Sequence, residues 1–328
     1  MKFIGACLAV FLSLRVASAG EPLPEGQIFQ PAHFEIIWAA PTNSQPTTLW
    51  IYRNIPQNFS TGMISNLMAL GSFTMRDRRK LPEEDLAKDK DGLAFVNKEE
   101  TRYLGISPAF GFIEYRDDKA NDVMKPVEGV PSEAKVKKLA LELLDKMGIP
   151  RFDFATKSAK KNDVLAFGDK ETRGHFDQKK KKFVNEVDKR GIFFIRKVEG
   201  VNFAGIGVAG GFHVEFASHA QIAQLEIVWR NLQPFQQYEI ASSKQIIDRV
   251  KEGKAVLPYP LANPDLNPSE IKKLTVKDFS PLYKGALGDE QQEFTFPFAK
   301  LDCIADTGKS NLNIQLYCPI LSTNTIGK

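Results

Sequence analysis

Only four histidines occur in the chain, and a general base or a zinc site would have to draw on them. His213 and His219 stand six residues apart across an expected strand end, and the zinc-protease pattern H-E-x-x-H is absent. We expect both at solvent-side or turn positions, with a metal site between them as the alternative. The 40 acidic residues include no pair that spacing singles out for acid–base work. We therefore expect no catalytic residue, metal or cofactor.

Two segments approximate phosphate-binding patterns. Residues 205–210 (GIGVAG) match the dinucleotide pattern G-x-G-x-x-G, which requires a helix to begin after the glycines. Residues 212–216 alternate like a strand, so we expect a glycine-rich strand connection instead. Residues 307–310 (TGKS) end like a phosphate-binding loop, but Cys303 stands where that loop needs a glycine. We expect neither segment to bind a nucleotide.

Ser107 lies in the segment 105–109 (GISPA), which is one residue short of a nucleophile elbow. The elbow needs a glycine at its last position and a helix directly after it. Pro108 and the strand-like residues 110–112 argue against both requirements. Serine hydrolase chemistry is therefore not expected from this segment.

A run of four lysines could form a basic patch. Its members are Lys179, Lys180, Lys181 and Lys182. One interpretation is a patch that binds an anionic polymer, an acidic lipid head group or cell-wall material. The favoured interpretation is a solvated hairpin loop, in which lysines also protect a sheet edge. Nucleic acid is not expected, because no exposed aromatic residues for base stacking are evident and the net charge is only +4.

The N-terminus predicts export. Lys2 is followed by an apolar run over 3–14, and small residues fill the cleavage-site positions within 16–19. The run is shorter than the ~20 residues of a membrane-spanning helix. Cleavage after residue 19 would remove Lys2 and Arg15 and no acidic residue, which leaves +2 of the +4 net charge. We expect a secreted or periplasmic protein with no membrane span.

Cys303 and Cys318 are the two cysteines beyond the signal peptide. Between them lie a turn pattern at 306–309 and an alternating strand pattern at 312–316. A hairpin of this kind could bring the two Cα atoms within disulfide reach, and an oxidising compartment favours the bridge. We therefore predict a disulfide between Cys303 and Cys318.

Periodicity predicts an α+β fold in which amphipathic helices each cover one face of an antiparallel sheet, in tandem modules. The strongest helix runs from Ser132 to Gly148, with one apolar stripe. Its members are Val136, Leu139, Ala140, Leu143, Leu144 and Met147. A second helix begins with a capping box formed by Ser242 and Gln245. Strand patterns dominate 163–240 and return after 294.

The N-terminal third predicts shorter elements. A helix is expected at 61–70, and strands are expected at 34–38, 48–52, 93–96 and 110–115. Residues 76–92 are mostly charged and are expected to form an exposed loop. The whole chain is then divided as follows: signal peptide 1–19, flexible mature N-terminus 20–32, N-terminal α+β domain 33–118, first module 131–241, second module 242–321 and tail 322–328.

The two modules resemble the PepSY-type propeptide and regulatory family. The likeness rests on hydrophobic patterns with a few glycines, at 147–150 (MGIP), 198–201 (VEGV), 210–216 (GGFHVEF), 225–229 (LEIVW) and 242–247 (SSKQII). It covers about 131–321 and excludes the N-terminal third. The resemblance implies a helix packed on an antiparallel sheet, and a class of proteins that restrain secreted peptidases or bind partners in the cell envelope.

These observations favour an exported, non-enzymatic binding or regulatory protein that acts on an extracytoplasmic protein or peptide. Two alternatives stay open. One is an extracellular hydrolase whose site is assembled from scattered residues, which a cleft gathering His213 or His219 with carboxylates would favour. The other is an envelope-polymer-binding protein that uses the lysine-rich loop.

Overall fold

The structure is a computed structural model that describes residues 26–31, 33–41, 46–120, 128–154, 170–177, 181–204, 210–258, 266–285 and 292–325. The expected signal peptide at 1–19 lies outside these ranges. Within them, no helix combines the length and the apolarity needed to cross a membrane. The chain forms two compact units. Unit 1 comprises 1–52, 234–284 and 294–328, and unit 2 comprises 53–233 and 285–293.

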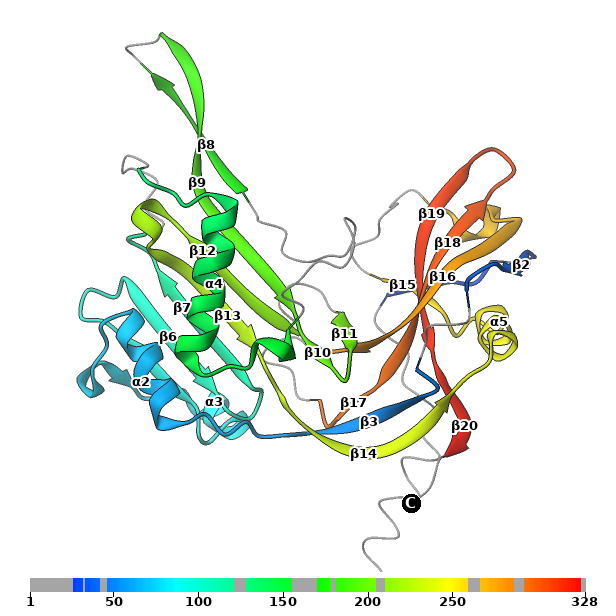
Figure 1. Ribbon diagram of the computed structural model, residues 1–328, viewed down its shortest axis with the longest axis horizontal. Coiled ribbons are helices and arrows are strands. Elements are labelled where there is room, and N and C mark those ends of the chain that lie inside the picture. Colours follow the sequence, from blue (N-terminus) through cyan, green and yellow to red (C-terminus); the bar gives the residue numbers. More distant parts are fainter. Residues whose placement is uncertain are drawn as a thin grey trace, which may run out of the picture. The chain divides into compact units, whose positions relative to one another are not determined.

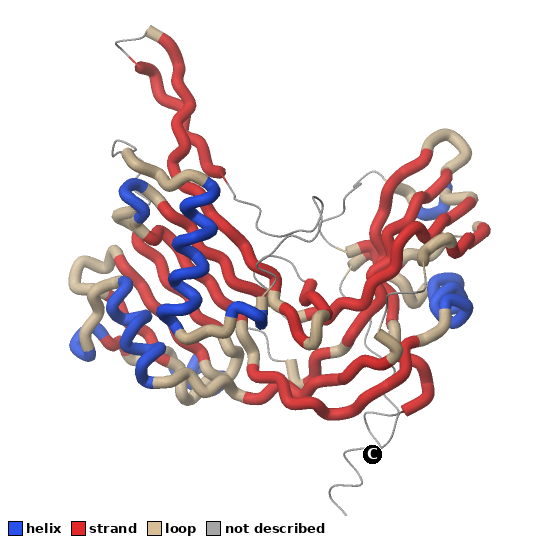
Figure 2. The backbone as a smooth tube through the Cα atoms, in the orientation of Figure 1, coloured by secondary structure: helices blue, strands red, loops and turns tan. Residues whose placement is uncertain are grey.

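The expected α+β class is confirmed. Over the described residues, four α-helices accompany three β-sheets, and strands predominate (Figures 1 and 2). The tubes in Figure 2 distinguish the long strands from the few short helices.

The sheet of unit 2 contains eight strands. Their spatial order is β4 (Arg78–Arg79), β5 (Leu93–Val96), β6 (Arg102–Ser107), β7 (Phe112–Asp117), β13 (Ile222–Val228), β12 (Gly211–Phe216), β9 (Lys182–Ile195) and β8 (Lys170–Asp177). Every neighbouring pair is antiparallel. An antiparallel sheet can bury one face and leave the other in water, which suits the alternating sequence of these strands.

Two helices cover one face of this sheet (Figure 1): α2 (Thr61–Leu70) and α4 (Glu133–Met147). The apolar stripe of α4 is confirmed, because Val136, Ala140, Leu143, Leu144 and Met147 are buried in the core. Gly148 ends α4 in the left-handed conformation, at φ 72°. Ser132 occupies the N-cap position, but its side chain makes no capping hydrogen bond.

Helix α2 has the bounds that the sequence predicts. The Ser60 side chain accepts a hydrogen bond of 3.1 Å from the backbone nitrogen of Met63, and thereby satisfies one free amide of the first turn. Met63 and Leu67 are buried, and α2 packs against α4. The short helix α3 (Glu83–Lys88) and strand β4 lie in the region that we expected to be an exposed loop.

The expected division between 118 and 131 falls inside one continuous sheet. Strand β7 pairs with β13 over five residues, with Ile113 opposite Ile227. Hydrophobic alternation marks which face of a strand is buried, but it does not say which strand lies alongside. The N-terminal third and the expected first module therefore share the core of unit 2.

Unit 1 contains a second antiparallel array, in the order β1 (Gln27–Ile28), β15 (Val256–Leu257), β19 (Asn311–Pro319), β18 (Pro297–Asp306) and β16 (Lys273–Lys284). Strand β2 (Glu35–Trp38) pairs in parallel with β16. Helix α5 (Ser243–Lys251) packs against β19, and its predicted capping box is confirmed. The Arg249 guanidinium of α5 donates hydrogen bonds to the carbonyls of Pro319 and Leu321, at 2.8 and 2.5 Å.

A third sheet has the order β17 (Phe294–Thr295), β3 (Thr48–Ile55), β14 (Asn231–Ile240) and β20 (Leu321–Thr325). The segments expected to be a flexible N-terminus and a tail both contain paired strands. Within the expected flexible N-terminus at 20–32, β1 pairs with β15 and Phe29 is fully buried. Within the expected tail, β20 pairs with β14. Neither segment carries a long periodic pattern, so tertiary pairing decides its structure.

Candidate functional site

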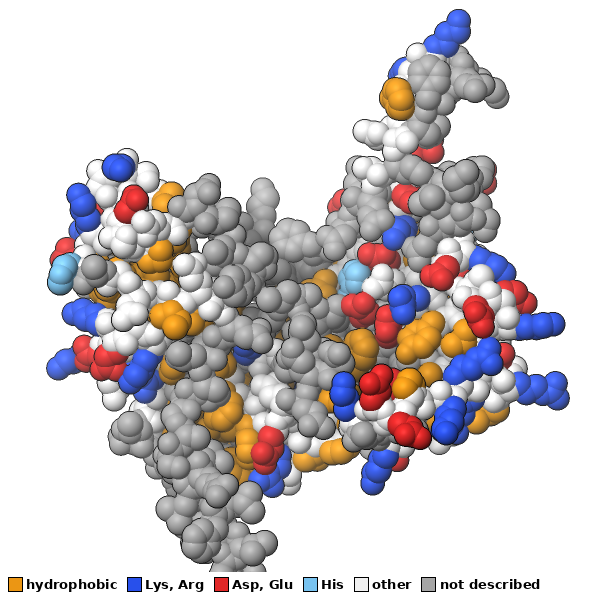
Figure 3. Space-filling view, turned by 180° about the vertical axis from the view of Figure 1, so that it is seen from behind, with side chains coloured by type: hydrophobic (Ala, Val, Ile, Leu, Met, Phe, Trp, Pro, Cys, Tyr) orange, Lys and Arg blue, Asp and Glu red, His pale blue; other side chains and the backbone are white. Residues whose placement is uncertain are grey.

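The face of the unit 2 sheet opposite α2 and α4 is the first candidate surface, and we call it the open face. Strand β12 shows how the sheet divides its residues: Phe212, Val214 and Phe216 belong to the helix-covered core, whereas His213 and Glu215 point to the other side. Seen from behind, acidic, basic and histidine side chains lie together on unit 2 (Figure 3).

His213 lies among carboxylates on this face. Its Nε2 atom is 3.8 Å from Oε1 of Glu215, and Glu226 stands directly opposite it on β13. The imidazole is only 14% exposed, and within the described residues its Nε2 atom has no hydrogen-bond partner. Gly191 makes room for this arrangement, since a Cβ atom there would lie 3.1 Å from His213 Nε2.

Glu215 is held by an ion pair. The Nζ atom of Lys189, on β9, lies 3.3 Å from Oε2 of Glu215, and both side chains are mostly buried. Removing one member of a buried ion pair leaves an uncompensated charge, which is costly. The pair therefore fixes the position of the carboxylate beside His213.

The adjoining part of the open face carries a second group of charges. Glu114 faces Glu226 across β7 and β13, and Nε of Arg116 lies 3.0 Å from Oε1 of Glu114. The Arg116 guanidinium also lies 5.4 Å from the ring centroid of Tyr103. Desolvation raises the pKa of Glu114; Arg116 opposes this shift and Glu226 adds to it. Gln224 donates a hydrogen bond of 2.6 Å to Glu226.

Replacing Glu114 by glutamine is expected to change the pH dependence of stability. A carboxyl group whose pKa is raised by folding contributes stability below its unfolded value of 4.5, and that contribution is lost as the pH rises through the folded value. The free energy of unfolding of Glu114→Gln relative to the unmodified protein should therefore increase between pH 4 and pH 7. Urea unfolding at both pH values measures this difference, and a decrease would contradict the prediction.

The structure separates the two histidines considered for a metal site. His219 lies in a short 3-10 turn (Ser218–Ala220), with its side chain 69% exposed and 3.8 Å from Glu128. Its neighbours are thus different from those of His213. Across the described ranges, no group of three or more His, Cys, Asp or Glu side chains is arranged to hold a metal ion.

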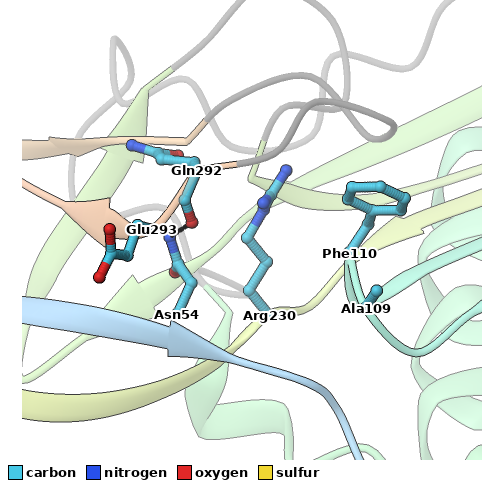
Figure 4. Close-up of a pocket in the computed structure, with 6 residues that line it drawn as sticks. All are labelled: Asn54, Ala109, Phe110, Arg230, Gln292 and Glu293. Carbon is cyan, nitrogen blue, oxygen red and sulfur yellow. Dashed lines mark hydrogen bonds between the residues drawn. The ribbon is translucent and has the colours of Figure 1, made fainter. Parts of the chain in front are cut away.

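The second candidate is a cavity of about 220 Å³ within unit 2. It is lined by Asn54, Ala109, Phe110, Arg230, Gln292 and Glu293 (Figure 4). In the close-up, the Arg230 side chain rises between Phe110 on one side and Asn54 with Gln292 on the other. Arg230 is only 4% exposed. The residues come from four separate stretches of sequence, so no local motif marks this cavity.

Ser107, from the near-match to a nucleophile elbow, supports the wall of this cavity. Its hydroxyl donates a hydrogen bond to Oδ2 of Asp89, a buried carboxylate that also accepts one from the backbone nitrogen of Ala109 at 3.1 Å. The segment forms the turn between β6 and β7. The element that follows it is strand β7, whereas a nucleophile elbow leads into a helix.

The two phosphate-binding patterns also lead into strands. Residues 205–209 lie outside the described residues, but β12 begins directly after Gly210. Residues 307–310 form the turn of the β18–β19 hairpin, where the Thr307 nitrogen donates to the Ser310 carbonyl at 3.1 Å. Neither arrangement offers a helix N-terminus to a phosphate.

The lysine run falls at the end of the β8–β9 hairpin. Lys179 and Lys180 lie outside the described residues, while Lys181 and Lys182 are exposed. The outer part of β9 pairs with β8 alone, because β12 pairs only with its residues 190–195. This ribbon extends beyond the sheet (Figure 1), and Phe183 near its end is 79% exposed.

The predicted disulfide does not form. Cys303 lies opposite Ile314, and Cys318 lies opposite Ala299, so the two thiols are four residues out of register on β18 and β19. At about 3.3 Å per residue this offset is roughly 13 Å, well beyond the reach of a disulfide. Both cysteines are buried thiols. The position of the turn at 307–310 sets this register, which residue spacing alone did not reveal.

We expect both thiols to be inert in the folded protein. Burial, with a further contribution from Asp302, raises the pKa of Cys303 to about 12. The thiolate is the reactive form, so labelling by dithiobis-nitrobenzoate at pH 8 should be negligible before unfolding. After unfolding in guanidinium, the form without residues 1–19 should react with the reagent and release two equivalents of nitrothiobenzoate per chain, one for each thiol. Two unreactive cysteines after unfolding without reductant would instead indicate a disulfide.

No protein family and no curated protein matches this chain. Among solved structures, the chain matches the crystal structure of an uncharacterized protein from Eubacterium rectale with a TM-score of 0.42 and 9% sequence identity over 90% of each chain. A likeness this distant carries no argument about fold or function.

Proposed function

We propose that this chain is an exported, non-enzymatic binding or regulatory protein whose partner is an extracytoplasmic protein or peptide, bound on the open face of unit 2. The observation that carries the proposal is the arrangement of the described residues around the eight-stranded sheet: α2 and α4 pack on one face, and fixed charges occupy the other. Export itself rests on the N-terminal sequence.

The β4 edge of this sheet favours the face over that edge as the contact surface. Edge strand β4 consists of two residues, Arg78 and Arg79, and both are exposed. Short, charged edge strands discourage pairing with another chain. By contrast, the open face offers mostly buried, pre-positioned groups such as Lys189, His213 and Glu215, which lose little side-chain freedom when a partner binds.

The resemblance to PepSY-type modules at 131–241 and 242–321 supports the same class of function. In the proposed modules, α4 covers the first set of strands and α5 covers β19 of the second. Members of that family restrain peptidases or bind envelope proteins, and the proposal carries that class over to this chain.

Site-specific cross-linking tests the proposal. A photoreactive amino acid at Gln224, on the open face, should yield a protein adduct of defined mass in the living cell, and Glu226→Lys should abolish it. The matched control is the same probe at Lys137, an exposed position on the outer side of α4. Equal adducts from both positions, or none from Gln224, would overturn the proposal.

An extracellular hydrolase is the second candidate, because His213 does lie beside carboxylates. Glu114 and Glu226 face each other, and the raised pKa of Glu114 suits a general acid. If this candidate is correct, Glu226→Gln should lower hydrolysis of cell-wall glycan by at least ~100-fold, which is the usual contribution of general acid–base catalysis. Unchanged or absent turnover would exclude it.

The hairpin end keeps the envelope-polymer alternative open, since Lys181 and Lys182 are exposed beside Phe183. Under this alternative, changing all four lysines of the run to serine should weaken binding to teichoic acid or heparin. Added salt should weaken the binding of the unmodified protein to the same polymers, because salt screens the attraction between exposed charges. Retained binding in the serine variant would remove the idea.

A further inference from the structure

We propose that the open face of unit 2 binds an arginine side chain of the partner peptide, held between Glu226 and Glu114. This inference rests on the proposed function and names the chemistry of the partner segment that the face contacts. The two glutamates lie on adjacent strands, β13 and β7, in the middle of the eight-stranded sheet.

Glu226 is a carboxylate without a cation beside it. Its neighbour Glu114 is paired with Arg116, whose Nε atom lies 3.0 Å from Oε1 of Glu114. Within the part of the chain that the structure describes, Glu226 forms no ion pair, and the one hydrogen bond that its side chain accepts comes from the neutral amide of Gln224. The negative charge of Glu226 is therefore available to a cation of the partner.

The position of Glu226 makes its negative charge unfavourable in the free protein. Glu226 stands directly opposite Glu114, and like charges at opposite positions of an antiparallel pair destabilise a sheet. Desolvation is the largest cause of the raised pKa of Glu114, and the charge of Glu226 adds to it. A guanidinium between the two carboxylates would relieve this repulsion, so the arrangement that weakens the free sheet strengthens the complex. Natural proteins keep such local conflicts mainly at functional sites.

The surroundings of the two carboxylates favour arginine over lysine. The Glu114 side chain is 23% exposed, so water screens its charge only in part. The ammonium group of lysine is more strongly hydrated than a guanidinium, and it therefore costs more to bring into such surroundings. A planar guanidinium also makes two parallel hydrogen bonds with a carboxylate, which an ammonium group cannot do.

The open face already holds one guanidinium of its own by the same chemistry. Arg116 pairs with Glu114 and lies 5.4 Å from the ring centroid of Tyr103. On the other side of Glu226, the imidazole of His213 stands directly opposite and is only 14% exposed. An arginine of the partner at Glu226 would thus meet a carboxylate and a ring, as Arg116 does.

Selection of displayed peptides on the whole mature protein tests the inference. A library of random nonapeptides should become enriched in sequences with arginine at one position, and this enrichment should be lost when the Glu226→Gln variant is the target. Selected peptides without a preferred arginine, or no selected peptide at all, would overturn the proposal.

Synthetic versions of the best selected peptide separate the charge of the side chain from its shape. They carry arginine, lysine or the neutral isostere citrulline at the preferred position. Fluorescence anisotropy should show citrulline binding more weakly than arginine by about tenfold or more, because charge-assisted hydrogen bonds are lost. Lysine should also bind more weakly than arginine. Equal binding of citrulline would contradict the electrostatic contact, and equal binding of lysine would contradict the assignment to arginine.

The Glu226→Gln variant locates the contact. Its amide keeps an oxygen that can accept the hydrogen bond from Gln224 and removes the repulsion with Glu114, so we expect the variant to fold. It should bind the arginine and citrulline peptides equally. The matched control is Glu142→Gln on α4, where the side chain is 54% exposed and lies 3.8 Å from Lys138; there the difference should remain. A difference that persists in Glu226→Gln would place the arginine elsewhere and overturn the proposal.

The outcomes separate this inference from the proposed function. If the adduct from the probe at Gln224 is recovered while arginine and citrulline bind equally, the proposed function stands and the arginine assignment is wrong. If neither the adduct nor peptide binding occurs, both are wrong. Analytical ultracentrifugation of the protein alone tests another occupant. A dimer that Glu226→Gln dissociates would overturn the peptide assignment, because a second copy of the chain would then cover the face.

Discussion

Replacing Leu144 by alanine is expected to lower the free energy of unfolding by about 2–5 kcal/mol, the range for deleting a fully buried leucine side chain. Leu144 is on the inner side of α4 and is fully buried in the core between that helix and the sheet of unit 2. The lost burial and the resulting cavity both contribute. Chemical denaturation followed by tryptophan fluorescence measures the change.

Lys137→Ala on the exposed side of the same helix is the matched control, with an expected change within about 0.5 kcal/mol. The two substitutions change helix propensity by nearly the same amount, because leucine and lysine have similar helix propensities, both slightly below that of alanine. Equal effects of the two substitutions would mean that α4 does not cover the sheet. The open face could then no longer be defined as the side opposite α4.

Helices were the most predictable part of this fold. The stripe from Val136 to Met147 and the stop at Gly148 are local signals, because each depends on residues within a few turns of one another. The capping box of Ser242 and Gln245 is of the same kind. Neighbouring residues determine these helix signals, and the structure therefore contains the helices where the sequence predicts them.

Strand partners were not predictable in the same way. The pairing of β7 with β13 joins residues more than a hundred positions apart, and the alternation of either strand fits many partners. The register of β18 and β19 shows the consequence on a smaller scale. Cys303 and Cys318 both lie in the hairpin, yet the turn sets them four residues out of register.

The candidate site depends on these long-range pairings. His213, Glu226 and Glu114 come from three strands and meet only because β12, β13 and β7 are neighbours. The cavity adds Arg230, which no motif singles out. The near-match at 105–109 was a weak local signal, and its role is to form a cavity wall instead of a nucleophile.

The turn behind that wall allows a strong test of the cavity. Gly111 has φ +60°, and a Cβ atom there would lie 2.6 Å from the Cα of Arg230 and 2.7 Å from the carbonyl oxygen of Trp229. Both obstacles are backbone atoms, so they cannot swing aside. Gly111→Ala is therefore expected to cost roughly 2–5 kcal/mol, from the left-handed conformation together with steric overlap.

Gly148→Ala separates the two contributions. Gly148 has a similar φ of +72°, but no atom lies within 4 Å of the added Cβ. Its replacement should cost only about 1–2 kcal/mol, the strain of a left-handed alanine. Thermal unfolding of both variants gives the difference. Equal costs would mean that the turn does not press against the backbone at Arg230, and the cavity would then lack a fixed wall on this side.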